Sequence, residues 1–377
     1  MFKHHALNLV TPDFDSSLTD VILDLEKLRK SYITGSTPVM IFLQLKRIFH
    51  LMESLGSARI EGNHTTVIEL IERQIDGHSF ENENIREIEN IEKALDFIDE
   101  SIDENPINHD FILHLHKLVV NGLSKEGDPH PGAYRTQNVA ITQSNHTPPD
   151  FLRVKDYMDE LIQFINRSDG AKYELLRMAI AHHRFTWIHP FTNGNGRTIR
   201  LLSYAMLLKQ RFDVRKGGRI LNPTAVFCND RDKYNTFLAK ADSGEKQDIL
   251  YWCEYVLGGL RDEIKKIDNL LNYDFLKANI LLPAIDKALE RKIITHEENT
   301  ILKIAVEKKE FQAKDISQKF KDQYPAQTSK RIKALLDKKM VASVEHHKYI
   351  YQVQFINNHL LRLIIEKLNK NGFIPDI

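Results

Sequence analysis

Cysteine is scarce in this sequence, which has only Cys228 and Cys253 among its 377 residues. Two cysteines make neither a disulfide framework nor a zinc site, so we interpret both as buried, inert thiols in a reducing compartment.

Neither sign of charge is in excess, because the chain has 52 Lys and Arg residues and 52 Asp and Glu residues. A chain without net charge has no bulk attraction to nucleic acid or to a membrane surface.

Long hydrophobic runs are also missing. No segment approaches the roughly 20 apolar residues of a membrane span, and residues 1–14 lack the basic-then-apolar pattern of a signal peptide. There is no Walker A lysine motif, which argues against an ordinary P-loop nucleotidase. His114 with His116 and the pair His182–His183 have no third ligand at zinc spacing, so we predict structural roles for them. We therefore expect a cytoplasmic protein without a membrane partner.

Helical periodicity dominates what is present. Hydrophobic residues make up 42% of the chain and charged residues 28%, as in an ordinary globular protein. Apolar residues recur at three- and four-residue spacing, and Asp and Ser stand near several starts as caps. This pattern predicts helices over residues 16–30, 38–57, 65–74, 82–103 and 108–121. No internal repeat interrupts them, so we expect the first two-thirds of the chain to form one mainly helical body.

The most informative stretch is residues 189–200, which read HPFTNGNGRTIR between predicted helices over 174–188 and 198–212. Pro190 and the Gly-Asn-Gly run do not continue a helix comfortably. The stretch is therefore a glycine-rich loop that leads into a helix N-terminus, with Arg197 and Arg200 in or near the first turn. Free backbone N–H groups, the positive end of the helix dipole and two guanidinium groups converge there, as a polyphosphate site requires. His189 stands at the entrance of this loop.

This stretch resembles the signature of the Fic family, H-P-F-x-[D/E]-G-N-G-R-x-x-R. It matches every specified position except Asn193, where the family usually carries an acid. So long a match is far more specific than a lone glycine-rich loop. The competing interpretation is a capped helix–loop–helix whose His and Arg side chains are merely solvated.

The resemblance implies a protein adenylyltransferase, which moves AMP from ATP to a Ser, Thr or Tyr hydroxyl of a target protein or of itself. His189 would be the general base, and Asn193 would lie near Mg²⁺. Arg197 would contact the β-phosphate and Arg200 the γ-phosphate. The other ATP-binding residues that the resemblance implies are Glu61, Gly194, Asn195, Gly196, Tyr234, Asn235 and Asp242. A homodimer is compatible with the same resemblance.

A second motif lies at residues 53–63, which read ESLGSARIEGN. Glu61 falls in the last turn of a predicted helix, with Gly62 as its C′ cap. The helix dipole opposes an acid at that end, so Glu61 favours a nearby cation. The segment also resembles [S/T]-x-x-x-E-[G/N], the inhibitory helix motif of Fic proteins, with Ser57 and Glu61 in register. This resemblance implies that Glu61 pairs with Arg200 and denies the ATP γ-phosphate its counter-ion; simple helix capping is the alternative.

Polar and apolar residues alternate over residues 138–142, and a Ser-Asn turn follows. This predicts a short β-hairpin, which resembles the Fic flap that holds a target segment by strand addition. An ordinary loop with edge pairing would suit the same residues. The flap residues are then Asn138, Val139, Ala140, Ile141 and Thr142.

Residues 231–245 resemble the family segment that closes over the nucleotide base. Tyr234, Asn235 and Asp242 are therefore candidates to line the adenine pocket. A Tyr at helical spacing is as readily a core residue as a ligand wall, so both interpretations of Tyr234 stay open.

The chain changes character after a boundary near residues 257–259. A charged amphipathic helix over 260–276 suits a connector. Three short helices over 297–306, 312–319 and 326–338 then precede paired strands over 340–344 and 349–353, which suggests a winged helix.

Residues 292–339 contain 12 Lys and Arg against seven Asp and Glu, an excess of five. Lys330, Arg331 and Lys333 would lie on the third helix of this region, where such domains enter the major groove. A modest excess more often marks a solvated face or a protein contact. Nucleic-acid binding is therefore the less favoured reading.

We therefore predict a mainly α protein. Its parts are a helical region over 1–105 with the inhibitory helix at 57–62, a Fic core over 106–257 with a β-hairpin flap, a connector over 258–290 and a winged-helix-like domain over 291–377.

Two other functions are alternatives to AMP transfer. One is AMP removal, with Glu61 orienting a water, or transfer of another phosphate-containing group. The other is a nucleic-acid-binding regulator with a vestigial core.

Overall fold

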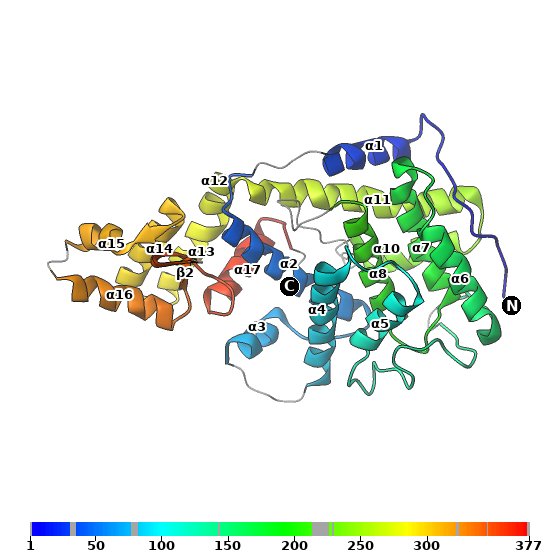
Figure 1. Ribbon diagram of the computed structural model, residues 1–377, viewed down its shortest axis with the longest axis horizontal. Coiled ribbons are helices and arrows are strands. Elements are labelled where there is room, and N and C mark those ends of the chain that lie inside the picture. Colours follow the sequence, from blue (N-terminus) through cyan, green and yellow to red (C-terminus); the bar gives the residue numbers. More distant parts are fainter. Residues whose placement is uncertain are drawn as a thin grey trace. The chain divides into compact units, whose positions relative to one another are not determined.

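The computed structural model is mainly helical (Figure 1). It describes residues 2–30, 35–76, 82–141, 144–212, 226–227, 230–321, 324–344 and 346–374. The chain divides into two compact units. The first comprises residues 1–33, 50–65 and 81–265, and the second comprises residues 34–49, 66–80 and 266–377.

The first unit consists of helices. They are α1 (Ser17–Lys30), the C-terminal part of α2 (Val39–Ile60), α4 (Glu83–Ser101), α5 (His109–Val119), η1 (Phe151–Arg153), α6 (Val154–Ile165), η2 (Ala171–Tyr173), α7 (Glu174–Ile188), α8 (Asn195–Lys209), α10 (Arg231–Ala241) and most of α11 (Lys246–Asp268). The helices predicted from periodicity are confirmed to within a few residues. Side-chain caps stand where they are expected, because Ser16, Asn82 and Asn108 accept backbone N–H groups at the starts of α1, α4 and α5.

Helix α8 is the centre of this unit and packs against α4, α5 and α7 (Figure 1). Nearly every residue of α7 and α8 is buried, including the charged side chains Arg184, Arg197 and Arg200. The loop between α7 and α8 is therefore held by two helices that are themselves fixed by packing on several sides. Such support suits a site that needs fixed geometry.

The β-hairpin predicted in this unit is a wrong prediction, because residues 138–141 form no strand and Thr142 lies outside the described residues. Side chains hold the segment instead. Arg135 donates to the carbonyl groups of Gln137 at 3.0 Å and Pro149 at 2.5 Å. Asn138 donates to the Asp150 carboxylate at 3.1 Å. These contacts fix both ends of the segment without a β-ladder.

The second unit contains helices and a small sheet. Its elements are the N-terminal part of α2, α3 (Val67–Asp76), η3 (Asn269–Leu271), α12 (Tyr273–Leu276), the π-helical η4 (Lys277–Leu281), α13 (Leu282–Glu290), α14 (His296–Lys308), β1 (Phe311–Gln312), α15 (Ala313–Phe320), α16 (Pro325–Asp337), β2 (Val341–Val344), β3 (His347–Val353) and α17 (Leu360–Lys370). The strands pair antiparallel in the order β1-β3-β2, with Phe311 opposite Tyr351 and Val341 opposite Val353. The three helices and two strands predicted over 297–353 are present.

In the described part of the second unit, strand β1 and helices α13 and α17 were not predicted as separate elements. Strand β1 has two residues, too few to show a period-2 pattern. Helix α17 does carry an amphipathic pattern, with Leu360, Leu361, Ile364, Ile365 and Leu368 buried, so its signal was readable in the sequence.

Helix α11 runs without interruption through Gly258 and Gly259, where a boundary was expected. A Cβ at residue 259 would lie 2.6 Å from Val226 Cγ1, whereas a Cβ at residue 258 would meet nothing within 4 Å. Gly259 therefore permits close packing, and neither glycine ends the helix.

The basic residues predicted on the third helix of the second unit lie on α16. Arg331 pairs with Glu297 at 3.2 Å and lies 4.6 Å from the Phe320 ring centroid, so its charge is partly compensated within the unit. Lys330 and Lys333 are exposed.

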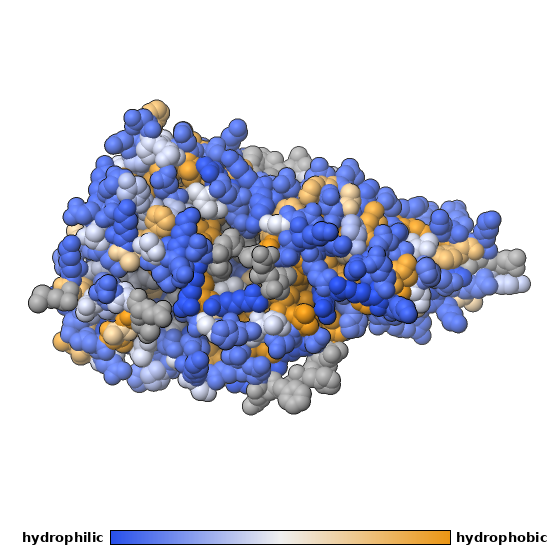
Figure 2. All heavy atoms as spheres, turned by 180° about the vertical axis from the view of Figure 1, so that it is seen from behind, coloured by the Kyte–Doolittle hydropathy of each residue, from blue (hydrophilic) through white to orange (hydrophobic). Residues whose placement is uncertain are grey.

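Figure 2 shows a face on which hydrophilic residues prevail and hydrophobic residues appear in scattered patches. Several large apolar side chains are individually exposed, including Phe14, Leu152 and Tyr349. Among the described residues, no helix has both the length and the apolar character that crossing a membrane demands.

Candidate functional site

The loop between α7 and α8 is closed by its own side chains. His189 ends α7 in the left-handed region with φ 50°, and Gly194 precedes α8 with φ 76°. Asn195 Oδ1 accepts the Phe191 N–H at 2.9 Å, and Asn195 Nδ2 donates to the Phe191 carbonyl at 2.9 Å. The Asn195 side chain therefore holds the loop in its closed conformation, and Asn195 is also the first residue of α8.

His116 on α5 packs against this loop and donates a hydrogen bond to it. Its ring stacks on Phe191 with centroids 3.7 Å apart. The Gly132 N–H donates to His116 Nδ1 at 3.1 Å, so Nε2 carries the proton and donates to the Asn193 carbonyl at 3.1 Å. Burial lowers the pKa of His116 to about 4, although Asp128 and the Asn193 carbonyl act in the opposite direction. The structural role predicted for His116 is confirmed, and it serves the loop.

Asp128 is a loop contact that sequence reasoning missed. Its Oδ2 accepts the Asn193 N–H at 3.0 Å, and its Oδ1 accepts the His130 N–H at 2.8 Å. The side chain is buried beside His116 Nε2, 3.6 Å away. No motif marks Asp128, because it lies in an irregular segment far from the loop in sequence.

His189 is held through its backbone. Arg135 Nε donates to the His189 carbonyl at 2.9 Å, and the Arg135 N–H donates to the Pro190 carbonyl at 2.9 Å. Burial lowers the pKa of His189 to about 4, against the interaction with the Thr186 carbonyl, which raises it. At neutral pH the neutral imidazole can therefore accept a proton, and its Nδ1 has no hydrogen-bond partner within the described part of the chain.

Arg200 donates hydrogen bonds to the C-terminal end of α2, as the motif at residues 53–63 predicts. Its Nε donates to Ser57 Oγ at 2.8 Å, and its Nη2 donates to the Ser57 carbonyl at 3.0 Å and to Glu61 Oε1 at 2.6 Å. The predicted contact between Glu61 and Arg200 is thus present. Gly62 adopts φ 101° after the helix ends at Ile60, so its prediction as the C′ cap is confirmed.

The Glu61 carboxylate lies against the first turn of α8. A Cβ on residue 196 would lie 2.3 Å from Glu61 Oε1, so only glycine leaves this space. Burial acts to raise the pKa of Glu61, but the charges of Arg200 and Arg197 outweigh it and the pKa lies below its ordinary value. An ionised carboxylate therefore occupies the anion-binding end of α8.

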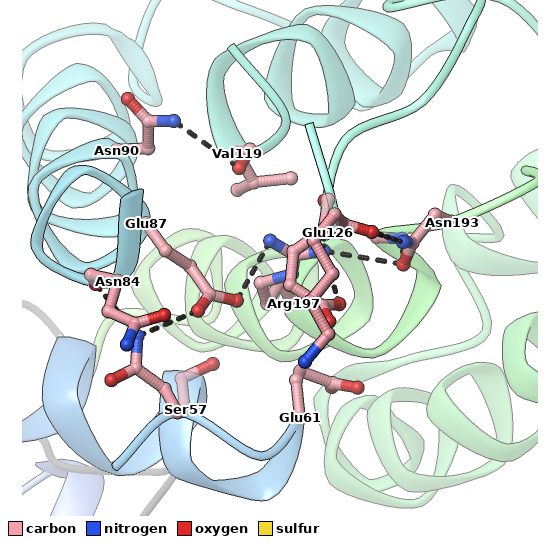
Figure 3. Close-up of polar contacts among 12 residues, drawn as sticks. Ser57, Glu61, Asn84, Glu87, Asn90, Val119, Glu126, Asn193 and Arg197 are labelled. Carbon is pink, nitrogen blue, oxygen red and sulfur yellow. Dashed lines mark hydrogen bonds and ion pairs between the residues drawn. The ribbon is translucent and has the colours of Figure 1, made fainter. Parts of the chain in front are cut away.

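Arg197 is turned toward other acids rather than toward solvent. Its side chain has 0% exposure, and its Nη1 lies 2.9 Å from Glu87 Oε1. Its Nη2 donates to the Glu126 carbonyl at 2.8 Å and to Asn193 Oδ1 at 3.4 Å. Figure 3 shows the guanidinium between Glu87 and Glu126. Sequence reasoning missed both partners, although an acid at Glu87, next to the buried Ile88 of α4, was a readable signal.

Burial raises the pKa of Glu87 above its ordinary value, while Arg197 and Asn63 act to lower it. Arg197 and Arg200, which both lie on α8, each pair with a carboxylate of the protein. Their positive charges are therefore compensated within the protein.

Asn193 is half-buried and caps the turn before α8, because its Oδ1 accepts the Gly194 N–H at 2.6 Å. Within the described ranges, no group of three or more His, Cys, Asp or Glu side chains is arranged to hold a metal ion. Asn193 Oδ1 is a neutral oxygen with hydrogen bonds already made. Such an oxygen would be a weak ligand for a hard cation such as Mg²⁺.

The three adenine-pocket candidates stand in different surroundings. Tyr234 is buried with its hydroxyl 2.9 Å from His182 Nε2, so it is a core residue. Asn235 is exposed on the same helix, and Asp242 pairs with His183 Nε2 at 2.9 Å. Contacts among the described residues do not bring the three side chains together in one cluster.

The segment expected to act as a flap is anchored beside the end of α7. His146 Nε2 lies 2.8 Å from the Trp187 carbonyl, and Arg135 links the segment to the His189 carbonyl. Residues 138–141 thus belong to the neighbourhood of His189, although they form no strand.

The fold resembles solved Fic structures. A Fic family protein from Desulfovibrio desulfuricans superposes with a TM-score of 0.60 at 20% identity, covering 93% of this chain and 98% of that one. Fic-1 from C. elegans superposes with a TM-score of 0.51 at 21% identity, covering 66% of this chain and 71% of that one. At such identities the likeness concerns the fold alone.

Curated relatives carry the name protein adenylyltransferase Fic. The one from Nematostella vectensis is 26% identical over 242 residues, covering 61% of this chain and 52% of its own length. The one from Drosophila virilis is 28% identical over 204 residues, covering 52% of this chain and 38% of its own length. The chain thus spans about half, or less, of the length of these relatives.

Residues 106–207, which run from the start of α5 through the loop to α8, match the family model described as Fic/DOC family. This match, the named relatives and the fold agree with the loop signature, and residues 106–207 form a Fic/DOC family domain within the chain.

Proposed function

We propose that this chain is a protein adenylyltransferase, which transfers AMP from ATP to a Ser, Thr or Tyr hydroxyl of a target protein. One observation carries the proposal: an unprotonated His189 stands at the mouth of a glycine-rich loop whose Arg200 already binds a carboxylate. A guanidinium at a helix N-terminus that accepts a carboxylate also suits a phosphate.

In this reaction the target hydroxyl oxygen attacks the α-phosphorus of ATP in line. The bond between the α-phosphorus and the oxygen that bridges to the β-phosphate breaks, and pyrophosphate leaves. His189 takes the hydroxyl proton, for which its lowered pKa leaves the imidazole free at neutral pH. Phosphoryl-type transfer depends chiefly on positioning and charge stabilisation, which the rigid loop supplies.

The phosphates would be held by the loop and the helix that follows it. Backbone N–H groups of Gly194–Gly196 and the dipole of α8 suit the α- and β-phosphates. Arg197 would contact the β-phosphate and Arg200 the γ-phosphate. Mg²⁺, when bound, supplies positive charge to the phosphate oxygens, and Asn193 Oδ1 is the side-chain oxygen that would hold it. The adenine would lie along residues 231–245, beside Asn235 and Asp242.

We further propose that Glu61 inhibits the transfer. Its carboxylate takes the Arg200 Nη2 hydrogen bond at 2.6 Å and fills the space above Gly196. ATP must therefore displace a like charge from the anion site before its γ-phosphate can reach Arg200. Ser57, which accepts from Arg200 Nε, would strengthen the closed arrangement.

Target binding would use the segment of residues 138–142. Main-chain groups of residues 138–141 form no β-ladder, so an extended target segment could pair with them by strand addition.

For the second unit we propose a winged-helix-like domain, from the element order α14, β1, α15, α16, β2, β3. The pairing of Arg331 with Glu297 favours a protein contact over nucleic acid for this domain.

AMP removal is a second candidate, and one observation favours it. The Glu61 side chain retains 28% exposure, and Arg200 Nη2 donates to its Oε1. The remaining oxygen could orient a water molecule toward an AMP-modified side chain.

A pair of assays distinguishes AMP transfer from AMP removal. ATP labelled at the α-phosphorus is incubated with wild-type protein and with Glu61→Gly, and protein-bound label is measured on the chain and on added proteins. We expect more label with Glu61→Gly, because the Glu61 carboxylate no longer competes with the γ-phosphate for Arg200. AMP-modified protein is incubated with the same two forms, and faster loss of AMP with wild type than with Glu61→Gly would favour removal. No protein-bound label with either form would contradict adenylyl transfer.

A further inference from the structure

Glu87 on α4 has two different partners, one for each carboxylate oxygen. Oε1 lies 2.9 Å from Arg197 Nη1, and Oε2 accepts from Asn63 Nδ2 at 2.8 Å (Figure 3). The side chains of Glu87 and Arg197 have 2% and 0% exposure. A charge pair so thoroughly removed from water holds its geometry, because neither partner has solvent as an alternative.

Asn63 connects Glu87 to the end of α2. Its backbone N–H donates to the Ala58 carbonyl at 3.1 Å, which closes the helix. Its side chain also donates to the Asn84 carbonyl at 2.7 Å and accepts the Thr65 N–H at 2.9 Å. Every hydrogen-bonding group of the Asn63 side chain is therefore used to hold Glu87 and α4 at a fixed place.

Arg197 is held on one side and has donors left on another. Glu87 faces Nη1, and the Glu126 carbonyl accepts from Nη2 at 2.8 Å. Among the described residues, the buried Nε donor of Arg197 has no hydrogen-bond partner, and Nη1 faces the Glu87 carboxylate without a hydrogen bond of good geometry. A longer contact joins Nη2 to Asn193 Oδ1 at 3.4 Å. An arginine that is held in this way and keeps an unused buried donor can accept a further anionic oxygen.

We propose that Glu87 is a positioning residue, which fixes the Arg197 guanidinium so that it can receive the β-phosphate, with Asn63 fixing Glu87 in turn. This inference rests on the proposed function, in which Arg197 binds the β-phosphate. Glu61 lies close enough for the Arg197 charge to lower its pKa. Displacement of Glu61 by a nucleotide therefore opens the approach to Arg197, whereas Glu87 stays in place.

Nucleotide binding tests this role without any transfer step. ADP has a β-phosphate and AMP does not, so the ratio of their affinities reports on Arg197. Calorimetry is carried out with Glu61→Gly protein, in which the approach is open. We expect the further change Glu87→Gln to weaken ADP binding about tenfold, since loss of the charge frees the guanidinium to turn. AMP binding should stay within about twofold.

Three controls separate positioning from general damage. Asp96→Asn makes the same acid-to-amide change on an exposed part of α4 and should alter neither affinity. Asn63→Ala keeps both charges of the pair and should weaken ADP in the same direction, but less. In an Arg197→Ala background, Glu87→Gln should have no further effect on the ratio, because the residue that Glu87 positions is gone.

An equal loss of ADP and AMP affinity would overturn the proposal, as would an unchanged ratio or an effect that persists without Arg197. If Glu87→Gln does not fold, the Asn63→Ala ratio decides alone. Absence of AMP transfer with the expected ADP-to-AMP ratios would contradict only the proposed function. Absence of any ADP binding by Glu61→Gly protein would overturn both.

Discussion

Gly196 leaves the space that the Glu61 carboxylate occupies: a Cβ on residue 196 would lie 2.3 Å from Glu61 Oε1 and 3.0 Å from Arg200 Nη1. In the proposed function, Glu61 and the phosphates of ATP would therefore use the same place at the first turn of α8. The proposed inhibition would then be direct competition for one site.

This relationship predicts the effect of Gly196→Ala. The new methyl group would push Glu61 aside, but it would also cover the backbone N–H groups that suit the phosphates. In a Glu61→Gly background we expect Gly196→Ala to weaken ATP binding at least tenfold, about 1.4 kcal/mol, in calorimetry. Gly258→Ala is the matched control, because a Cβ there meets nothing within 4 Å. Equal ATP affinity with and without Gly196→Ala would show that the phosphates do not approach residue 196.

Ser57→Ala should relieve inhibition in part. Arg200 would lose the Ser57 Oγ contact but keep the Ser57 carbonyl and Glu61. We expect a transfer rate between those of wild type and Glu61→Gly, and no further gain when the two changes are combined. Ser54→Ala, one turn earlier on α2, removes a buried hydroxyl that has no hydrogen-bond partner and serves as the control. A Ser57→Ala rate no higher than that of wild type would contradict this role.

The pKa of His189 predicts a flat pH profile around neutrality. A base with a pKa of about 4 is unprotonated from pH 6 to 8, so kcat/KM for transfer should vary little there as far as His189 is concerned. In Glu61→Gly protein the pKa should fall further, because the Glu61 charge raises it. A tenfold rise per pH unit up to about pH 6.5, the ordinary His value, would contradict a buried, unprotonated base.

Asn193→Asp should strengthen the response to Mg²⁺. A carboxylate adds a formal charge, which a hard cation prefers to the neutral amide oxygen. In a Glu61→Gly background we expect a lower Mg²⁺ concentration for half-maximal transfer, with kcat nearly unchanged if metal occupancy is not limiting. Superimposable Mg²⁺ titrations with and without the change would show that this side chain is no ligand.

The sequence indicates the loop and its flanking helices well, because the signals are local. Pro190 and Gly194 end one helix and begin the next by backbone preference alone, and the apolar pattern of α7 and α8 is continuous. The contact of Glu61 with Arg200 joins distant segments, and it was predicted only because a family motif marks both ends.

The contacts around Arg197 and Asn193 could not be predicted in the same way. Asp128 lies in an irregular segment that no local pattern marks. Glu87 is a readable acid on the buried side of α4, but no local pattern identifies Arg197 as its partner. The hairpin failed for a related reason: alternation over residues 138–141 favours a strand, but Arg135 supplies hydrogen bonds that replace the ladder.

The most direct test of the whole account compares Glu61→Gly with Glu61→Gly/His189→Ala, using ATP labelled at the α-phosphorus. The first protein should transfer labelled AMP to protein hydroxyls. The second should transfer it about 10²–10⁴-fold more slowly, because the general base is lost, while calorimetry shows ATP affinity largely unchanged. Equal rates of labelling by the two proteins would contradict the role of His189 and, with it, the proposed mechanism.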